Sequence, residues 1–332
     1  MKRLGAVILA IAMIGGAWLL RDRLDGDDGS GGSGGGGGDD VEQVRLRCAT
    51  ELEQVCRQLA EGRDDVRVSI EDPGTTSDAL VALPEGDDPG FDAWLVDAPW
   101  AEITADNRRF ANTSGTVLGD PSAVLARSPA VIAVQSQQLD GLTEACGGTI
   151  SWRCIGEQPT SLRVGLATPE RGDGLVSLAG ATASFLGTTD YSTTDFEEPG
   201  FIAWFDRLTE LSARTPLGRQ SPLARAVVAP GTFQVTGALE SQSAELLRSR
   251  DNYRAIYPEP MTTADIRLVP RLQLEASELV DRLGSDELGA ALTDAGWRID
   301  GRAPEGATDA PALPADAQLP APGVLQQLRE RW

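Results

Sequence analysis

The chain has 332 residues, 41% of which are hydrophobic, and a formal net charge of −21. This length allows one large domain or two lobes, and the apolar content is too high for a chain that is disordered throughout. The acidic balance argues against nucleic acid and anionic membrane surfaces as partners, because both are bound through a basic face.

The chain contains no histidine, and Lys2 is its only lysine. A Ser-His-Asp triad, a Cys-His pair, a histidine-ligated zinc and a Schiff-base lysine in the folded part are therefore excluded. Two carboxylates suffice for glycoside hydrolysis, but aromatic residues make up only 5% of the chain, which is low for a cleft that stacks sugars. We expect no enzymatic activity, no catalytic residue, no cofactor and no metal.

An apolar run at the N-terminus, residues 4–20, is flanked by Lys2, Arg3 and Arg21. A membrane-spanning helix needs ~20 apolar residues, whereas a secretory signal has an apolar core of about 7–15 residues and a cleavage site between small residues. We find no convincing cleavage site and predict that residues 1–24 form an uncleaved single-span anchor, with a cleaved signal peptide as the alternative. Either segment exports the rest of the chain, which is then membrane-tethered and extracellular or, after cleavage, secreted.

Residues 25–40 read DGDDGSGGSGGGGGDD. Glycine and serine do not gain enough contacts to become ordered, so this composition is typical of a flexible linker. Such a linker can hold a folded domain ~20 Å from the membrane.

Four cysteines form two pairs with the same spacing, Cys48 with Cys56 and Cys146 with Cys154. An even number in an exported chain indicates disulfides, and four cysteines permit three pairings. We favour Cys48–Cys56 and Cys146–Cys154, because each closes a short local loop. Eight residues of straight helix span ~12 Å, too far for a disulfide, so Cys48 should end a strand and Cys56 should lie in the next helix. Metal ligation by the cysteines is the alternative, although the spacing is not C-x-x-C.

Strands and helices alternate along the rest of the chain. We predict a helix capped by Thr50, and a later helix broken near Gly284-Ser285. The alternation predicts an α/β fold with mixed, mostly parallel sheets. The predicted strands are 44–49, 66–70, 91–97, 131–134, 164–167, 233–238, 253–257 and 266–269, and the predicted helices are 50–59, a short one within 71–80, 201–214, 240–250, 276–295 and 324–331.

Polar loops follow several of these strands, at the edge where an α/β fold binds its ligand and where helices begin. Free hydroxyls and backbone N–H groups at such places suit an anion or a polar solute. Each loop also has a structural explanation, because Ser and Thr cap helices and Gly allows positive φ. The candidate ligand-binding residues are Thr75, Thr76, Ser77, Asp97, Ser128, Thr168, Asp173, Thr236 and Gly237.

Four stretches resemble, in the same order, segments of the bacterial extracellular solute-binding proteins of the type II periplasmic-binding fold, the group that includes molybdate-binding proteins. The stretches are FDAWLVDAPWAEI at 91–103, LARSPAVIAV at 125–134, RVGLATPERGDGLVSL at 163–178 and RAIYPEPMTTADIRLV at 254–269. The resemblance covers residues 41–299. The sequence departs from the family where Glu170-Arg171 follows Pro169, and where Ala98-Pro99 follows the third strand.

The resemblance implies two lobes that close on a small polar or anionic solute, with residues 41–126 plus 230–332 as the first lobe and 127–229 as the second. Ser128-Pro129 and Pro230-Gly231 have the chemistry of hinges at the two crossings. The implied partners are a small polar solute, a membrane transporter of the ABC type or another cell-envelope protein, and no nucleic acid. The alternatives are an interaction or scaffold domain that has lost the solute, and a hydrolase with two acids facing each other about 5–9.5 Å apart.

Overall fold

The computed structural model describes residues 43–111, 113, 115–159, 161–212, 220–247, 252–307, 309–315 and 317–332. The predicted anchor (1–24) and linker (25–40) lie outside the described residues. In the described part of the chain, no helix combines the length and the apolar character needed to cross a bilayer.

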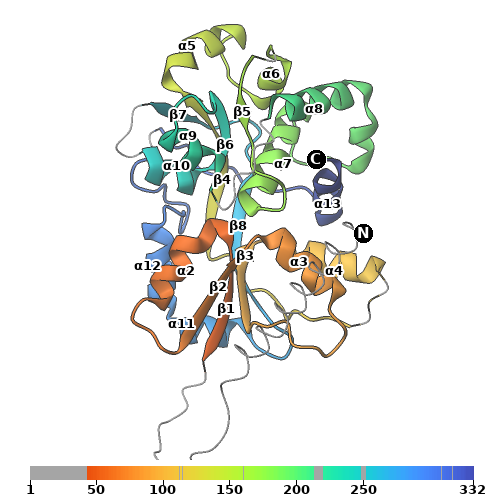
Figure 1. The fold of residues 1–332 in the computed structure, drawn as a ribbon, viewed down its shortest axis with the longest axis vertical. Helices are drawn as coiled ribbons and strands as arrows, with labels where there is room; N and C mark the ends of the chain where they lie inside the picture. The colour runs from red at the N-terminus through yellow and green to blue at the C-terminus, as the bar shows by residue number, and fades with distance from the viewer. Residues whose placement is uncertain are drawn as a thin grey trace, which may run out of the picture. The chain divides into compact units, whose positions relative to one another are not determined.

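The strands are hydrogen-bonded in the order β2-β1-β3-β8-β4-β6-β5, and β7 also pairs with β4. This arrangement, with helices beside the strands, confirms the predicted α/β class (Figure 1). The strands are β1 (Val44–Ala49), β2 (Val66–Glu71), β3 (Ala93–Asp97), β4 (Ala126–Gln135), β5 (Val164–Gly165), β6 (Val235–Leu239), β7 (Tyr253–Ile256) and β8 (Thr263–Pro270).

The sheet is mixed, but the expectation that it is mostly parallel is wrong. Among the strands described, the pairs β1–β2, β1–β3 and β5–β6 are parallel, whereas β3–β8, β4–β6, β4–β7 and β4–β8 are antiparallel. The antiparallel pairs all involve β4 or β8. These two strands are neighbours in the middle of the strand order and run in opposite directions. Each also pairs antiparallel with its other neighbours.

The long strand β4 divides the fold into two halves. Its beginning, through Pro129, pairs with β8, and from Ala130 onward it pairs with β6 and β7. We call β1, β2, β3 and β8 with their helices the first half, and β5, β6, β7 and the end of β4 with theirs the second half. Figure 1 shows β4 and β8 passing between the two.

The strand pairing corrects the expected position of the second crossing. Ser128-Pro129 lies where β4 changes partners from β8 to β6 and β7. The return does not follow Pro230, because β6 and β7 still pair with β4 in the second half. The chain returns between the end of β7 at Ile256 and the start of β8 at Thr263.

Helices cover both halves (Figure 1). The first half carries the 3₁₀ helix η1 (Thr50–Leu52), α2 (Glu53–Ala60), α3 (Pro73–Ala82), α4 (Trp100–Phe110), α11 (Ala276–Leu283) and α12 (Ser285–Asp294). The second half carries α5 (Ser136–Ala145), α6 (Trp152–Glu157), α7 (Gly172–Leu186), the 3₁₀ helix η2 (Thr193–Glu197), α8 (Pro199–Leu211), α9 (Pro222–Val228) and α10 (Glu240–Leu247). The last helix, α13 (Pro322–Arg331), contacts helices of both halves.

Two local expectations about helix ends have different outcomes. The predicted break near Gly284 is present, because Gly284 adopts a φ of +84° between α11 and α12, a conformation that glycine tolerates best. Thr50 does not cap the following helix. It is the first residue of η1, and its hydroxyl donates a hydrogen bond to Asp72 instead.

Both predicted disulfides, Cys48–Cys56 and Cys146–Cys154, are present. Cys48 lies near the end of β1 and Cys56 in α2, as the length of an eight-residue helix required. The first disulfide therefore ties the beginning of α2 to the strand before it. The polar groups that precede α2, including those of η1, are held beside the carboxyl end of β1.

Helix α7 lies at the centre of the fold. Every residue from Gly172 to Ser184 is buried, and the helix contacts β4, β6, β8, α6 and α13. Its sequence, GDGLVSLAGATASFL, is rich in Gly, Ala, Ser and Thr, and these small side chains let neighbouring elements approach closely. The N-terminus of α7 is therefore a buried end at which groups from other elements meet.

Candidate functional site

The loop between β5 and the start of α7 contains the sequence TPERGDG (168–174), which was predicted to bind a ligand. The carbonyl of Thr168 accepts a hydrogen bond from the N–H of Arg171 at 3.1 Å, which closes a turn before the helix. Thr168 itself is exposed. Arg171 and Asp173, in contrast, are only 4% and 2% exposed, so the polar chemistry of this loop lies at the start of α7.

Two carboxylates from the first half lie against the first residue of α7. A Cβ atom added to Gly172 would lie 2.0 Å from Oε1 of Glu51 and 2.5 Å from Oδ1 of Asp97. A larger residue there would displace the ends of these two side chains. Glu51 comes from η1, which follows β1, and Asp97 is the last residue of β3, so the ends of two neighbouring parallel strands bring them together.

Arg171 and Asp173 form the part of this site that belongs to the second half. The Nε and Nη2 atoms of Arg171 donate to Oδ1 and Oδ2 of Asp173 at 2.9 and 3.1 Å. The amide of Gln242 donates to Oδ2 of Asp173 at 2.8 Å. Asp72 lies on the other side of Arg171, with 3.9 Å between Oδ1 and Nη1. We call Glu51, Asp97, Arg171 and Asp173 the carboxylate cluster.

Glu51 and Asp97 differ from Asp173 because no basic group neutralises them directly. All four of their carboxylate oxygens are buried, and no described residue donates a hydrogen bond to any of them. Burial raises the pKa of Glu51 to about 7, helped by the negative charge of Asp173 and opposed by Arg171. Burial and the charge of Glu51 raise the pKa of Asp97 well above its usual range.

Asp173 titrates in the opposite direction. Burial alone would raise its pKa, but the charge and hydrogen bonds of Arg171, together with the hydrogen bond from Gln242, hold that pKa below the ordinary value. Arg171 is thus engaged by Asp173, and its pKa is raised in turn by these carboxylates. The cluster contains three carboxyl groups and one guanidinium, so it is negatively charged when all four are ionised, and a bound proton or cation reduces that charge.

The hydroxyls predicted around α3 are exposed or occupied within the first half. Thr75 is exposed. Thr76 donates to Oε2 of Glu71 at 2.7 Å, and Oγ of Ser77 accepts a hydrogen bond from Thr104 at 2.8 Å. Thr76 and Ser77 therefore join α3 to its neighbours β2 and α4.

The predicted residues on β4 and β6 are buried near the centre of the fold. Oγ of Ser128 accepts a hydrogen bond from the N–H of Ser241 at 3.0 Å, which ties the first crossing to α10. Thr236 is fully buried, and no described residue hydrogen-bonds its hydroxyl. Gly237 packs against Leu166, whose Cδ2 lies 2.6 Å from the position that a Cβ would take. Of the nine candidates, Asp97 and Asp173 are the two that come together in the carboxylate cluster.

Two members of the cluster, Glu51 and Arg171, were not predicted as site residues. Glu51 follows Thr50 in the predicted first turn of a helix, where an acidic residue is expected simply because it complements the helix dipole. Arg171 was noticed only as a departure from the family pattern. The departure from the family pattern could itself have identified Arg171. An arginine two residues before Asp173, in a loop that otherwise resembles the family, indicates an ion pair between the two.

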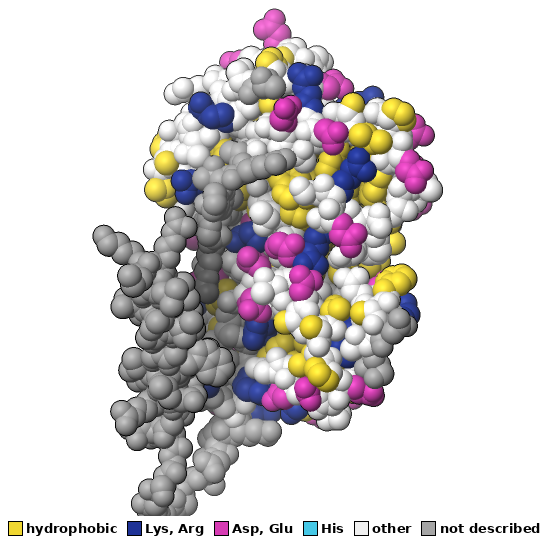
Figure 2. Space-filling model, turned by 45° about the vertical axis from the view of Figure 1, so that its right-hand side comes forward, with side chains coloured by type: hydrophobic (Ala, Val, Ile, Leu, Met, Phe, Trp, Pro, Cys, Tyr) yellow, Lys and Arg dark blue, Asp and Glu magenta, His cyan; other side chains and the backbone are white. Residues whose placement is uncertain are grey.

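Helix α13 closes one side of the region around the cluster. Arg329 donates to Glu170 at 2.9 and 2.7 Å and to Asp78 at 3.0 and 2.6 Å, and its guanidinium carbon lies 5.6 Å from the ring centroid of Trp100. Glu170 precedes α7, whereas Asp78 and Trp100 lie on α3 and α4. Arg329 therefore joins the two halves. In Figure 2, which brings this side forward, acidic and basic side chains lie next to one another at mid-height.

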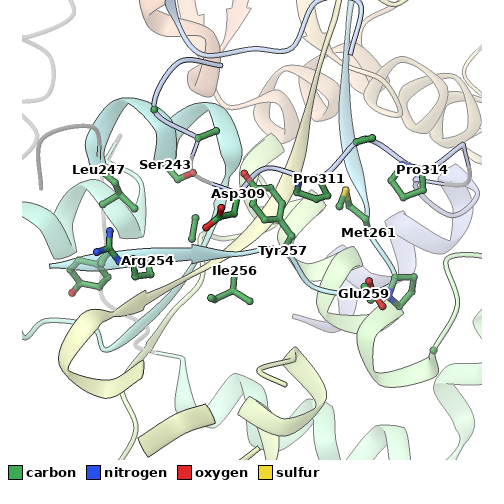
Figure 3. A pocket seen from close by; sticks show the side chains of 17 residues that line it. Ser243, Leu247, Arg254, Ile256, Tyr257, Glu259, Met261, Asp309, Pro311 and Pro314 are labelled. Carbon is green, nitrogen blue, oxygen red and sulfur yellow. The ribbon is translucent and has the colours of Figure 1, made fainter. Parts of the chain in front are cut away.

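A large hollow among the described residues lies away from the cluster. It has a volume of about 1110 Å³ and is lined by β7, the end of α10 and the Pro- and Ala-rich segment that precedes α13. Figure 3 shows Arg254, Ile256 and Tyr257 on or just after β7, and Asp309, Pro311 and Pro314 on the segment that precedes α13. Its walls come from the second half and the C-terminal segment, so it is not a space between the ends of β1 and β3 and the start of α7.

No family model and no curated protein sequence matches the chain. Solved structures do match it. They include the periplasmic thiamin-binding protein (14% identity, TM-score 0.57, 91% of this chain and 97% of that one) and iron-bound HitA from Pseudomonas aeruginosa (12%, 0.57, 87% and 98%). The fructose-6-phosphate-bound AfuA from Actinobacillus pleuropneumoniae also matches (12%, 0.56, 87% and 97%).

These likenesses confirm the fold that the sequence resemblance implied. The chain has the α/β fold of the periplasmic and extracellular solute-binding proteins, and the match extends over nearly the whole length of each of them. The ligands in their names are a vitamin, a metal ion and a sugar phosphate. Such different ligands on one fold leave the solute of this chain to be argued from its own residues.

Proposed function

We propose that this protein is an exported, membrane-tethered solute-binding protein that captures a small polar solute between the two halves, at the carboxylate cluster. The observation that carries the proposal is that buried ionisable groups from both halves converge on the N-terminus of α7. Buried charges near an interface between movable parts are costly unless they have a role in binding. The disulfides and the exported fold fit an extracellular location.

The strand pairing supports a revised division into lobes. We propose that residues 43–129 and 263–332 form the first lobe and residues 130–256 the second, with hinges at Ser128-Pro129 and between β7 and β8. Glu51 and Asp97 then lie on the first lobe, and Arg171 and Asp173 on the second. Opening the lobes would hydrate both carboxylates, and closing them on a solute would bury the solute with them. An ABC-type transporter is the proposed recipient of that solute.

The proposal is tested by thermal unfolding of the full-length oxidised chain in detergent micelles, with a panel of oxyanions, amines, sugars, amino acids and divalent cations. A solute at about 100 times its dissociation constant stabilises the folded protein by about 2.7 kcal/mol, which raises the midpoint measurably. We expect one class to raise it, and Asp97→Asn to reduce the effect while the exposed Glu278→Gln leaves it unchanged. No shift with any class contradicts solute binding.

A specific observation favours a second function, an interaction domain that keeps the fold without a solute. The carboxylates of Glu51 and Asp97 already fill the space at Gly172, and Arg329 already joins both halves. The two functions differ in motion. Distances between spin labels on α2 and α8 should change on adding the solute if the protein is a binding protein, and should stay constant across the panel if it is a closed interaction domain.

A further inference from the structure

We propose that the solute is a small organic cation, an ammonium or guanidinium compound, which pairs with Glu51 and Asp97 and replaces a proton that these two carboxyl groups share in the solute-free protein. This inference rests on the proposed function and names its solute class. It keeps the expectation of a small polar solute and departs from the expectation that the solute is an anion.

The carboxylate oxygens of Glu51 and Asp97 are hydrogen-bond acceptors at the place where we propose that the solute binds. Asp97 is fully buried, and neither of its carboxylate oxygens receives a hydrogen bond from a described residue. The same holds for both carboxylate oxygens of Glu51. Unpartnered buried oxygens of this kind require a donor, because a buried acceptor without one loses its hydration and gains nothing in return. A proton shared between them, or a donor-rich solute, supplies what is missing.

The positive charges near the cluster are already engaged. Arg171 forms two hydrogen bonds with Asp173 and faces Asp72 at 3.9 Å. Arg329 is bound to Glu170 and Asp78. The groups that face Glu51 and Asp97 from the packed elements are therefore Asp173 and Arg171 of the second half, which cancel each other. The carboxyl pair keeps its own negative charge when ionised.

This charge balance separates the candidate solutes. An oxyanion at Gly172 would lie against two carboxylates at a distance where like charges repel strongly in a dry site. The helix N-terminus, which attracts anions in other proteins, is here already faced by the protein's own carboxylates. Two carboxylates complement one ammonium or guanidinium through charge-assisted hydrogen bonds, whereas a divalent metal usually takes four or more ligands.

The space at Gly172 sets how the cation enters. Because an added Cβ atom there would overlap Glu51, the structure leaves no room for a further group between Gly172 and this carboxylate. The solute-bound form must therefore be less closed. Charge balances in the exchange: the carboxylic proton leaves to solvent, both carboxylates are then ionised, and the solute cation replaces the lost positive charge.

The experiment is calorimetric titration of the full-length chain in micelles with the monocations methylguanidinium and methylammonium, repeated in buffers that differ in ionisation enthalpy. At pH 6, below the raised pKa of Glu51, we expect the better probe to bind with release of about one proton, and at pH 8 with release of much less. Sodium sulfate and divalent metal chlorides are titrated in parallel. The proton count is measured on the unchanged protein, so it does not depend on whether a variant folds.

The matched variants sharpen the result. Glu51→Gln should weaken binding of the cation roughly thirtyfold or more and abolish the proton release, since one partner of a buried charge pair is lost. Glu278→Gln makes the same chemical change on an exposed position of α11 and should change neither quantity.

The outcomes separate this inference from the proposed function. Cation binding with proton release supports both. Binding of sulfate alone, of a metal ion alone, or of a cation without proton release overturns the cation-for-proton exchange and leaves a solute-binding protein. Absence of binding by all probes, together with no shift across the wider thermal panel, overturns the proposed function as well.

Discussion

Two buried carboxylates of this protein, Glu240 and Glu51, have opposite surroundings. Glu240 is fully buried, and Arg298, itself 1% exposed, donates to its two oxygens at 2.6 and 2.5 Å. Tyr257 donates a further hydrogen bond to Glu240 at 2.6 Å, and the remaining Nη1 of Arg298 donates to the carbonyl of Pro311 at 2.8 Å. Glu51 has Asp97 beside it and receives no hydrogen bond from a described residue.

The comparison teaches how to tell a structural buried charge from a binding one. The Glu240–Arg298 pair neutralises itself, is hydrogen-bonded at both ends and joins α10 to the segment before α13, so it is complete without a ligand. The Glu51–Asp97 pair is incomplete, because it needs a proton or a cation. Burial is similar at the oxygens of both sites, and the difference lies in what neutralises them.

Breaking the complete Glu240–Arg298 pair is expected to have the largest effect on stability. Arg298→Ala leaves the carboxylate of Glu240 buried without its cationic partner and with only the hydrogen bond from Tyr257, which should lower the free energy of unfolding by about 3–5 kcal/mol. Urea denaturation of the full-length oxidised chain at pH 7 measures this. Arg302→Ala removes an exposed arginine nearby and should change the stability by less than about 0.5 kcal/mol. Equal effects of the two changes would contradict the structural role of the pair.

The incomplete pair predicts a pH dependence. The pKa of Glu51 rises from 4.5 to about 7 on folding, so the folded protein holds a proton that the unfolded chain releases. Its stabilising contribution is fully present below pH 4.5 and is lost as pH rises through about 7, a fall of about 3 kcal/mol in the free energy of unfolding. Asp97, whose pKa burial also raises, adds to this fall, whereas Asp173, whose pKa is lowered, acts only at more acidic pH. Urea midpoints across this pH range measure the fall.

A matched variant assigns this pH dependence to Glu51. Glu51→Gln cannot ionise, so it should lose the part of the fall that Glu51 contributes, keep the part that the buried Asp97 contributes, and be more stable than the unchanged protein at pH 8. Glu278→Gln should keep the original profile, because that residue is exposed. A profile that survives in Glu51→Gln would place the proton elsewhere.

The smallest expected effect concerns the contact that α13 makes across the halves. Arg329→Ala should lower the free energy of unfolding by only about 1 kcal/mol, because the side chains of its partners Asp78 and Glu170 are 61% and 42% exposed. It should nevertheless increase hydrogen exchange at α3 and at the start of α7, since these are the elements that Arg329 joins. Unchanged exchange in both would show that α13 does not restrain them.

Local patterns predicted local structure well. The alternating residues of β1, the disulfide loops and the break at Gly284 depend on neighbours in the sequence, and all were predicted. The return of the chain was misplaced at Pro230, because Pro-Gly indicates a turn without indicating which strand pairs next. The mostly parallel sheet was wrong for a related reason: the direction of β4 and β8 depends on their passage between the halves.

The residues of the carboxylate cluster, the proposed site, were predicted in part for the same physical reason. Asp97 and Asp173 were found because they end a strand and begin a helix, which are positions that sequence periodicity locates. Glu51 was missed because its importance comes from the proximity of Gly172, which is 121 residues away in the sequence (172 − 51) and lies in the other half of the fold. No local pattern distinguishes a glutamate that faces solvent in the first turn of a helix from one that faces a second carboxyl group.

The most direct test of this account is whether Glu51 and Asp97 share a proton in the solute-free protein. Infrared difference spectra between pH 6 and pH 8, compared for the unchanged chain and for Glu51→Gln, detect the carbonyl stretch of a protonated buried carboxyl group. The account predicts that this band is present at pH 6, decreases at pH 8 and loses this pH dependence in Glu51→Gln. Two ionised carboxylates at pH 6, with no such band, would contradict it.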